Sequence, residues 1–512
     1  MTIQHPSAYA ATAPDRTALV VEPGGATRTY AELEARSNQV AHLLRDRGLQ
    51  VGDAVAVLLE NRVEFFEVTV AAMRMGLLVT PINWHLAPDE AAYIIRDSEA
   101  SALVASAALA PVLDHVLASG EEGAPSVRLA VGGAVDGFDD YESALAAQPT
   151  TPVDDQCEGT WMLYSSGTTG RPKGIKPGSV GGELGAPTSF SALVAGLYGF
   201  GEDKVYLSPA PLYHAAPAGW TNAVHRLGGT AVVMDRFDPL TTLELIERHG
   251  VTHVQFVPTH LVRLLKLPEQ ERARFDLSSL ECVVHAAAPC PPEVKRAALD
   301  WLGPIVHEYY SGSEGAGFCA IGPEEWLAHP GSVGRSLLGT AHVTDADGTE
   351  LDTGEVGQIW FESGQSFTYH GDAEKTKAAH NDRGWATLGD MGYLDDEGYL
   401  YLTDRVSNMI ISGGVNIYPR EIEDVLILHP AVADVAVVGV ADPDMGESVR
   451  AVVQLAGDVP ADADLEEALI AFARERLSSF KCPRSVVVVD ELPRLATGKL
   501  AKRLLPAEAL AP

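Results

Sequence analysis

Short apolar runs alternate with longer segments of helical spacing along the first part of the chain. The run at residues 54–59 precedes a helical pattern, and the run at 77–82 precedes another over 87–97. The same alternation returns at residues 231–234 and 251–257, each followed by a helical stretch. Such alternation is typical of βαβ units in a parallel sheet. Because ligands usually bind at the strand ends of such sheets, a site is expected there.

The pattern changes after Pro330, where short β-like runs are separated by turns rich in Gly and Asp. Examples are residues 358–362 and 399–403, the second preceded by the turn 395–398. Runs of this kind indicate hairpins and not βαβ units. The sequence therefore predicts a small β subdomain over about residues 330–404.

A separate unit is predicted at the C-terminal end. A helix is expected from Pro419, strands at 432–440 and 450–455, and an amphipathic helix at 465–477. The expected fold is α/β: a large N-terminal domain of βαβ-type sheets plus the small β subdomain, with a mobile C-terminal α+β domain. The predicted boundaries are 1–404 for the N-terminal domain, 405–408 for a hinge and 409–512 for the C-terminal domain.

Composition excludes several classes of protein. With 512 residues and 46% apolar side chains, the chain buries a large core and is not intrinsically disordered. The formal net charge of −33 repels nucleic acid and anionic lipid, so neither is an expected partner. An anionic ligand must therefore be held by backbone donors and a few well-placed cations.

The cysteines and the apolar runs bear on the compartment. The five cysteines are scattered with no C-x-x-C pair, unlike a disulfide framework or a zinc site. No run approaches the ~20 apolar residues of a membrane span, and residues 1–15 do not resemble an export signal. A cytoplasmic protein without a membrane partner is expected.

The most informative stretch is residues 164–174, which reads YSSGTTGRPKG. Its glycines let the backbone approach a ligand, its hydroxyl and amide groups are donors, and its two cations add positive charge, which together suit a polyphosphate. It is not a Walker A loop, because Pro172 precedes the lysine where that motif needs glycine, and no Ser or Thr follows the lysine. The predicted phosphate-binding residues are Ser165, Ser166, Gly167, Thr168, Thr169, Gly170 and Lys173.

This string resembles the phosphate loop of the adenylate-forming superfamily, in particular its acyl-CoA synthetase branch. Five further segments resemble signatures of that family and follow in the family's order. They are 287–289 (AAP), 308–315 (EYYSGSEG), 384–390 (GWATLGD), 403–419 (TDR leading into ISGGVNIYP) and 492–499 (LPRLATGK). The resemblance thus spans nearly the whole chain.

The resemblance implies a reaction in two halves. ATP and a small-molecule carboxylic acid form an acyl adenylate, and coenzyme A then takes the acyl group after the C-terminal domain has rotated. Lys499 matches the catalytic lysine, Glu314 the carboxylate that positions Mg²⁺, and His214 an aromatic or histidine gate to the acid. ATP, Mg²⁺ and CoA are the implied cofactors and substrates.

Further residues take roles from the same resemblance. Nucleotide contacts are implied for Ala287, Ala288, Pro289, Tyr310, Ser313, Asp390 and Arg405, although Tyr309 beside Tyr310 leaves that register open. Gly413 and Gly414 match the loop along which the pantetheine arm of CoA passes, and Ser407 matches the pivot of the hinge. His214, Trp220 and His285 are candidates for the acyl pocket, with ordinary core positions as the competing interpretation.

The sequence departs from the family pattern at a few positions. Ser311 stands where glycine is usual, Ser313 and Leu388 where threonine is common, and Ser407 where the pivot is usually charged. These departures leave open an enzyme that performs only the CoA thioesterification of a preformed acyl adenylate. A ligase that loads a separate carrier protein also remains open, as does a catalytically silent nucleotide-binding paralogue.

Small residues near the proposed pocket favour a bulky, apolar acid over acetate; they are Ala215, Ala216, Ala218, Gly219 and Ala286. A homodimer is the default expectation for oligomeric state, because dimers are the commonest soluble oligomers.

Overall fold

The structure of the protein is a computed structural model of the chain. It describes residues 3–118, 124–165, 172–176, 178, 180–363, 367–405, 408–412, 415–443, 445–457, 459, 461, 463–494 and 500–511.

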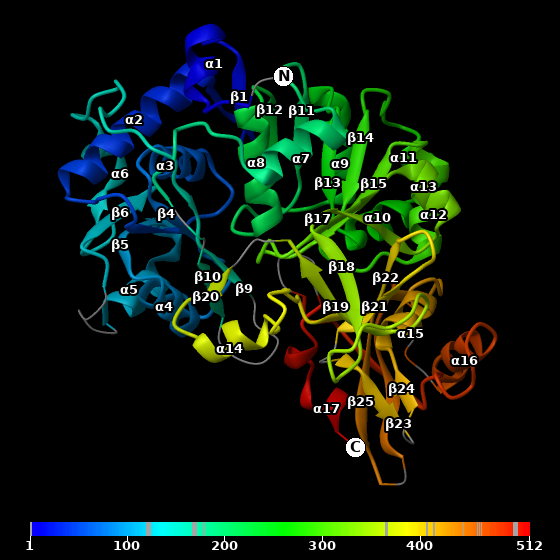
Figure 1. Ribbon diagram of the computed structural model, residues 1–512. Helices are drawn as coiled ribbons and strands as arrows, with labels where there is room; N and C mark the ends of the chain where they lie inside the picture. The colour runs from blue at the N-terminus through cyan, green and yellow to red at the C-terminus, as the bar shows by residue number, and fades with distance from the viewer. Residues whose placement is uncertain are drawn as a thin grey trace. The chain divides into compact units, whose positions relative to one another are not determined.

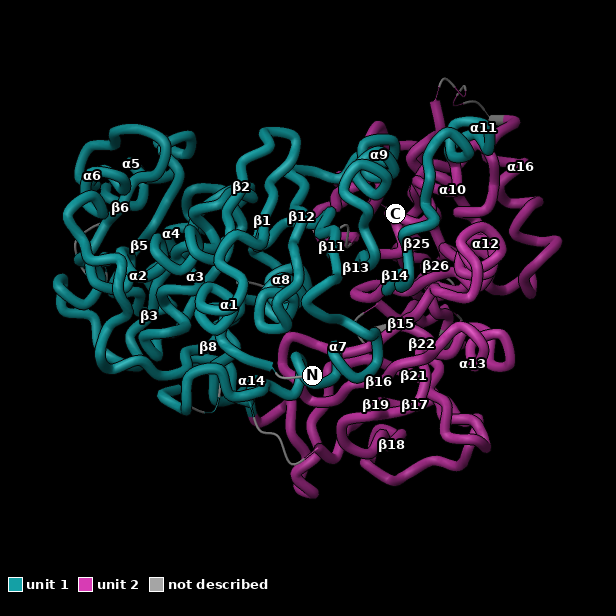
Figure 2. Tube along the Cα trace, turned by 90° about the horizontal axis from the view of Figure 1, so that it is seen from above, with its two compact units in different colours: residues 1–256, 267–284, 366–376 teal, residues 257–266, 285–365, 377–512 magenta. Residues whose placement is uncertain are grey.

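The chain divides into two compact units (Figure 2). Unit 1 comprises residues 1–256, 267–284 and 366–376, and unit 2 comprises residues 257–266, 285–365 and 377–512. The chain passes from one unit to the other within β14 (Cys282–His285) and within α14 (Ala373–Ala378). Each unit is described by itself.

Unit 1 contains a six-stranded sheet in which all neighbouring strands are parallel. Its order is β7 (Asp139–Asp140), β6 (Val127–Val131), β5 (Ala100–Ser106), β3 (Ala54–Leu58), β4 (Leu78–Pro81) and β8 (Thr160–Trp161). Its helices are α2 (Tyr30–Asp46), α3 (Val63–Arg74), α4 (Pro88–Asp97), α5 (Ala110–Ala118) and α6 (Tyr141–Leu145), with the short η1 (Ala107–Leu109). In Figure 1, α2 and α3 lie on one side of the sheet and α4 and α5 on the other.

The alternation of apolar runs and helical patterns in this region is confirmed. All five residues of β3 are buried, as expected for a strand covered on both faces. Helix α2 begins at a capping box in which the Thr29 hydroxyl accepts from the Glu32 amide and the Glu32 carboxylate accepts from the Thr29 amide. Local sequence signals, an apolar run and a capping box, therefore account for strand β3 and for the start of helix α2.

A second group of strands in unit 1 is also parallel except at its end. It runs in the order β13 (His253–Phe256), β11 (Val205–Ser208), β12 (Thr230–Met234), β1 (Thr17–Glu22) and β2 (Ala26–Thr29), with β2 antiparallel to β1. A small antiparallel sheet contains β20 (Thr368–Tyr369), β10 (Lys173–Lys176) and β9 (Leu163–Ser165). The remaining helices of unit 1 are α1 (Ser7–Thr12), α7 (Ser189–Tyr198), α8 (Ala215–Arg226), α9 (Pro239–His249) and α11 (Glu269–Arg272).

Unit 2 contains the predicted β-rich region. Its strands run in the order β18 (Thr340–Thr344), β19 (Gly357–Glu362), β21 (Asp390–Leu394), β22 (Leu400–Arg405), β17 (Ser332–Leu338), β16 (Phe318–Ile321) and β15 (Val306–Ser311). These pairings are antiparallel. The helices are α10 (Pro258–Leu265), α12 (Pro292–Leu302) and α13 (Pro323–Ala328).

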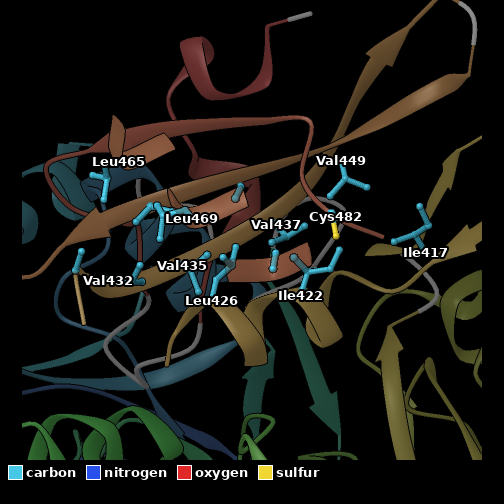
Figure 3. Close-up of a cluster of buried hydrophobic side chains, with 14 of the residues drawn as sticks. Ile417, Ile422, Leu426, Val432, Val435, Val437, Val449, Leu465, Leu469 and Cys482 are labelled. Atoms are coloured by element: carbon cyan, nitrogen blue, oxygen red, sulfur yellow. The ribbon is translucent and has the colours of Figure 1, made fainter. Parts of the chain in front are cut away.

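The C-terminal α+β part of unit 2 has its own sheet and core. Strands β24 (Val415–Ile417), β23 (Ile410–Ser412), β26 (Gly446–Leu455) and β25 (Val432–Asp442) pair in that order, and β27 (Ser485–Val489) lies parallel to β26. The helices are α15 (Pro419–Leu426), α16 (Ala463–Arg474), η3 (Lys502–Leu504) and α17 (Ala507–Leu510). Figure 3 shows Ile422 and Leu426 of α15 and Leu469 of α16 in one buried cluster with residues of β25. The predicted helix at 465–477 is confirmed in type, but it begins at Ala463 and ends at Arg474.

Within the described part of the chain, no helix combines the length and the apolar character needed to cross a membrane.

Candidate active site

Several predicted site residues lie outside the described residues. They are Lys499, the phosphate-loop residues 166–170, the pivot Ser407 and the glycines 413 and 414. The side chains of Ser165 and Arg405 are likewise not described, although their backbones belong to β9 and β22. The roles inferred for these residues remain predictions.

The strands that flank the predicted phosphate loop form a hairpin in unit 1. Strands β9 and β10 pair antiparallel, with Ser165 opposite Lys173. The Lys173 ammonium lies 2.9 Å from an Asp372 carboxylate oxygen, and this hydrogen bond raises the pKa of Lys173. Lys173 is therefore a fully charged cation at neutral pH, and Asp372 holds it at the base of the loop.

The two tyrosines of the second predicted adenine segment face different surroundings, because side chains alternate along β15. Tyr309 is buried and stacks on Phe318, with ring centroids 5.2 Å apart. The Tyr310 hydroxyl donates to an Asp390 carboxylate oxygen at 2.6 Å. This contact joins the predicted adenine segment to the predicted ribose segment, and it favours Tyr310 over Tyr309 as the nucleotide residue.

Asp390 begins β21 and is buried, with 8% of its surface exposed. In the ladder between β21 and β22 it lies directly opposite Arg405. Two predicted nucleotide residues thus share one position of the sheet. A carboxylate at this position can accept hydrogen bonds from a sugar.

The departure at Ser311 has a structural explanation. Its hydroxyl donates to the Gly317 carbonyl at 2.8 Å, across the turn that follows β15. The Ser311 side chain is thus used to close this turn. Inside the turn, the Gly315 amide donates to the Gly312 carbonyl at 3.1 Å, Ser313 is exposed and Glu314 is half-buried.

The first predicted adenine segment contains a strained residue. Ala287 has φ of +73°, in the left-handed region where an alanine costs roughly 1–2 kcal/mol. Strain of this kind is concentrated at functional sites, where surrounding structure enforces it. Ala287 and Pro289 are exposed and Ala288 is half-buried, so this strained segment is accessible to a ligand.

Two models of the AMP-binding enzyme family match the chain. The model of the AMP-binding enzyme covers residues 7–368, which is more than half of the chain. The model of the AMP-binding enzyme C-terminal domain covers residues 421–499. The chain belongs to the AMP-binding enzyme family. The predicted resemblance to acyl-CoA synthetases is confirmed, and the chain is an acid–thiol ligase of the AMP-forming type.

Individual relatives agree with this assignment. The chain is 33% identical to a 2-succinylbenzoate–CoA ligase of Bacillus licheniformis, over 99% of this chain and 100% of that protein. It is 34% identical to a feruloyl-CoA synthase of Amycolatopsis, over 95% and 94% of the two chains. The crystal structure of ATP-bound MatB from Rhodopseudomonas palustris superposes with a TM-score of 0.81 at 30% identity, covering 98% of each chain.

The AMP-binding enzyme also contains a buried ionic cluster that the sequence did not reveal. In unit 2, the Lys295 ammonium of α12 lies 2.7 Å from a Glu308 carboxylate oxygen of β15, and His285 Nε2 lies 3.6 Å from the same oxygen. Burial opposes the ionisation of Glu308, yet the Lys295 ammonium lowers its pKa below the usual value. Burial lowers the pKa of His285 to about 4, so this imidazole is neutral at physiological pH.

This cluster connects the starts of both predicted adenine segments. His285 stands two residues before Ala287, and Glu308 stands two residues before Tyr310. His285 is completely buried beside Glu308 in this family member, and its acyl-pocket role remains a prediction. Glu308 was noted in the sequence only as the first residue of the motif 308–315, and nothing there indicated that it pairs with Lys295.

The predicted acyl-pocket residues of unit 1 lie at the start of α8. His214 directly precedes the helix, and its ring lies 4.3 Å from that of Tyr213, whose hydroxyl is 3.2 Å from His85 Nδ1. Trp220 is buried in an aromatic cluster, stacked 6.0 Å from Tyr206. The remaining rings around Trp220 are those of Phe190, Tyr198 and Phe200.

One expected open space beside α8 is partly filled. A Cβ atom placed on Gly219 would lie 3.3 Å from the Phe190 ring. Phe190 therefore takes part of the volume that the small residues leave, so the shape of any pocket in this AMP-binding enzyme depends on this ring as well as on Trp220.

Proposed function

We propose that this enzyme is an ATP-dependent acyl-CoA synthetase that activates a bulky, apolar carboxylic acid as its acyl adenylate and transfers the acyl group to CoA. The contact between Tyr310 and Asp390 carries the proposal, because it brings together two motifs that are separated by eighty positions in the chain. A nucleoside needs an apolar face for its base and acceptors for its ribose hydroxyls, and these two side chains supply both.

The adenylating half requires control of negative charge, because a carboxylate attacks the α-phosphate and pyrophosphate leaves. Lys173 and the donors of residues 165–170 would hold the phosphates, and Lys499 would bridge the acyl and phosphate oxygens. Removing one preorganised donor of this kind typically costs about 2.7–4 kcal/mol of barrier stabilisation.

Glu314 would hold Mg²⁺. The residue fits this role, because it offers a half-buried carboxylate next to the predicted nucleotide residues, and Mg²⁺ is commonly bound by one or two carboxylates together with substrate phosphates and water. When bound, the ion would neutralise phosphate charge that the acidic protein otherwise repels.

The second half requires the C-terminal domain, over 409–512, to rotate about the hinge at 405–408. Gly413 and Gly414 would then let the pantetheine arm pass close to the backbone, and the thiol would attack the acyl carbonyl while AMP leaves. His214 would open or close the path to the acyl group. Residues at element ends commonly absorb the changes of backbone angle that such a rotation needs.

Two observations support a bulky acid. The residues at the start of α8 are small, and the aromatic cluster around Trp220 and Phe190 offers an apolar wall. The two relatives from Bacillus licheniformis and Amycolatopsis are named for aromatic acids, 2-succinylbenzoate and ferulate. We further place the reaction in the cytoplasm, because all five cysteines are free thiols.

The test separates the two half-reactions across a panel of acids. Acid-dependent exchange of pyrophosphate into ATP is measured without CoA, and thioester formation is measured with CoA and either ATP plus acid or a synthetic acyl adenylate. The panel contains 2-succinylbenzoate, ferulate, a long-chain fatty acid and acetate. We expect exchange and ATP-driven thioester formation with at least one bulky acid. In Lys499→Ala the rate of exchange should fall about 100-fold or more.

The matched control is Lys481→Ala, which removes one positive charge from the same C-terminal region. Lys481 forms a partly exposed ion pair with Glu421 at 2.6 Å, and such pairs contribute little, so exchange should be unchanged. Thioester formation from the supplied adenylate without any exchange would contradict the full synthetase and indicate an enzyme of the second half-reaction. Use of acetate alone would contradict the bulky acid.

A further inference from the structure

Gly312 lies between two side chains that the turn after β15 brings close together. A Cβ atom placed on Gly312 would lie 2.5 Å from Leu388 Cδ2 and 2.8 Å from Glu314 Oε2. Neither distance is compatible with a real carbon atom. The φ angle of Gly312 is outside the left-handed region, so the position excludes a side chain because of its neighbours and not because of its backbone.

The backbone on both sides of Leu388 is anchored by hydrogen bonds. The Thr387 hydroxyl donates to the Ile359 carbonyl at 2.7 Å and accepts from the Gly389 amide at 3.0 Å. Asp390, two residues on, accepts the hydrogen bond from Tyr310. The backbone of Leu388 is therefore fixed near Gly312 by the same strand end that carries the predicted ribose residue.

The backbone of the turn that carries Glu314 is also fixed by hydrogen bonds. The turn that carries it is closed by the hydrogen bond from Ser311 to Gly317 and by that from the Gly315 amide to the Gly312 carbonyl. Gly312 separates Leu388 from the Glu314 carboxylate and brings no side-chain volume of its own. An apolar methyl group and a carboxylate oxygen thus flank the same small space.

We propose that Leu388 and Gly312 are a matched pair that positions the Glu314 carboxylate. The leucine occupies volume that a side chain at position 312 would need. Because Gly312 has no side chain, the Glu314 carboxylate can lie close to its Cα atom. Leu388 is a positioning residue, because it acts through Glu314. This inference rests on the role of Glu314 that is proposed above, and it gives a physical meaning to the unusual leucine at 388.

The pair has a specific consequence for substitution. In Gly312→Ala the new methyl group must displace either the leucine or the carboxylate, and overpacking of this kind is unfavourable. The Glu314 side chain has one more rotatable bond than the Leu388 side chain, so its end yields more readily. The carboxylate should therefore move, and shortening Leu388 should let it return.

The experiment measures the dissociation constant for ATP by calorimetry without any acid, once with Mg²⁺ and once with excess EDTA. We expect Gly312→Ala to weaken binding of Mg·ATP about tenfold and binding of metal-free ATP less than about threefold. The double variant Gly312→Ala/Leu388→Ala should return to within about threefold of the unaltered enzyme. The midpoint of urea unfolding is recorded for each variant.

Gly322→Ala is the matched control. The same methyl group is added in the same unit, where the nearest atom is 3.9 Å away and φ is −81°. It should leave both dissociation constants unchanged.

Two results would overturn the pairing: unchanged Mg·ATP binding in Gly312→Ala, or a double variant that binds Mg·ATP as weakly as Gly312→Ala. Glu314→Gln separates this inference from the proposed function. If Glu314→Gln binds Mg·ATP normally while the pair still shows rescue, the metal role of Glu314 fails and positioning through Glu314 is overturned with it. If the unaltered enzyme binds no ATP, the proposed function fails, and rescue or additivity in the unfolding midpoint still decides whether 312 and 388 are matched.

Discussion

At the scale of single residues, Lys295 and Glu308 form a buried ion pair that joins α12 to β15 in unit 2. Both side chains are buried, and the Lys295 ammonium also lies 4.9 Å from the centre of the Trp326 ring. A buried pair is not by itself a large source of stability, because both ions lose their hydration. The loss of one partner is severe, because the remaining charge is then buried without compensation.

Lys295→Met is therefore expected to lower the free energy of unfolding by about 3–5 kcal/mol at pH 8. The deficit should shrink toward pH 5. Without Lys295 the folded-state pKa of Glu308 rises above its unfolded value, so the cost of burying its charge is present at high pH and is lost as the pH falls. Urea unfolding at the two pH values measures both effects.

The control for this pair removes both charges. Lys295→Met/Glu308→Gln should recover most of the loss, and its remaining deficit relative to the unaltered protein should depend little on pH between 5 and 8. A double variant that is as unstable as Lys295→Met would contradict an ionic origin and would indicate a packing defect around Trp326.

At the scale of elements, the join between β22 and α15 decides how the C-terminal part of unit 2 is held. One Asp404 carboxylate oxygen accepts from the Arg420 amide at 3.2 Å in the first turn of α15, and the other accepts from the Asn408 side chain at 3.1 Å. The Arg420 guanidinium donates to the Leu402 carbonyl at 2.8 Å. A carboxylate at the end of β22 thus accepts a hydrogen bond from a free amide in the first turn of α15, the helix that follows the predicted hinge.

Asp404→Ala should cost about 0.5–2 kcal/mol of local stability, as the loss of a helix cap does. Hydrogen exchange at the amides of α15 measures this, and exchange there should become faster. Asp404→Asn keeps an acceptor of the same shape and should change the exchange much less. If Asp404→Ala leaves the exchange of α15 unchanged, the contact does not hold the helix start.

At the scale of the whole molecule, charge is the dominant sequence property. At a net charge of −33, the excess carboxylates of the folded chain repel one another. Salt screens this repulsion, because the Debye length falls from about 30 Å at 0.01 M salt to about 8 Å at 0.15 M. Raising sodium chloride over this range should therefore raise the midpoint of thermal unfolding at pH 8. Near pH 5, close to the isoelectric point of about 4.8, the rise should largely disappear. A salt effect of equal size at both pH values would contradict self-repulsion.

The sequence by itself determined the class of fold and the family. The alternation of buried strands with helices is a local pattern, since burial on both faces demands continuous apolar runs such as 54–58, and the parallel sheet of unit 1 followed from it. The order of the motifs from residue 164 to residue 499 identified the family, because each motif is contiguous in the chain. The roles of Lys499, Ser407 and the glycines 413 and 414 rest on those motifs alone.

Only the tertiary structure decided which side chains meet. Tyr309 and Tyr310 are adjacent in sequence, but the alternation of β15 sends one to Phe318 and the other to Asp390. The Leu388 side chain meets Gly312 because the ends of two separate segments converge in unit 2. Neighbours of this kind depend on how distant strands are placed in a sheet, and a single sequence carries no local signal for that placement.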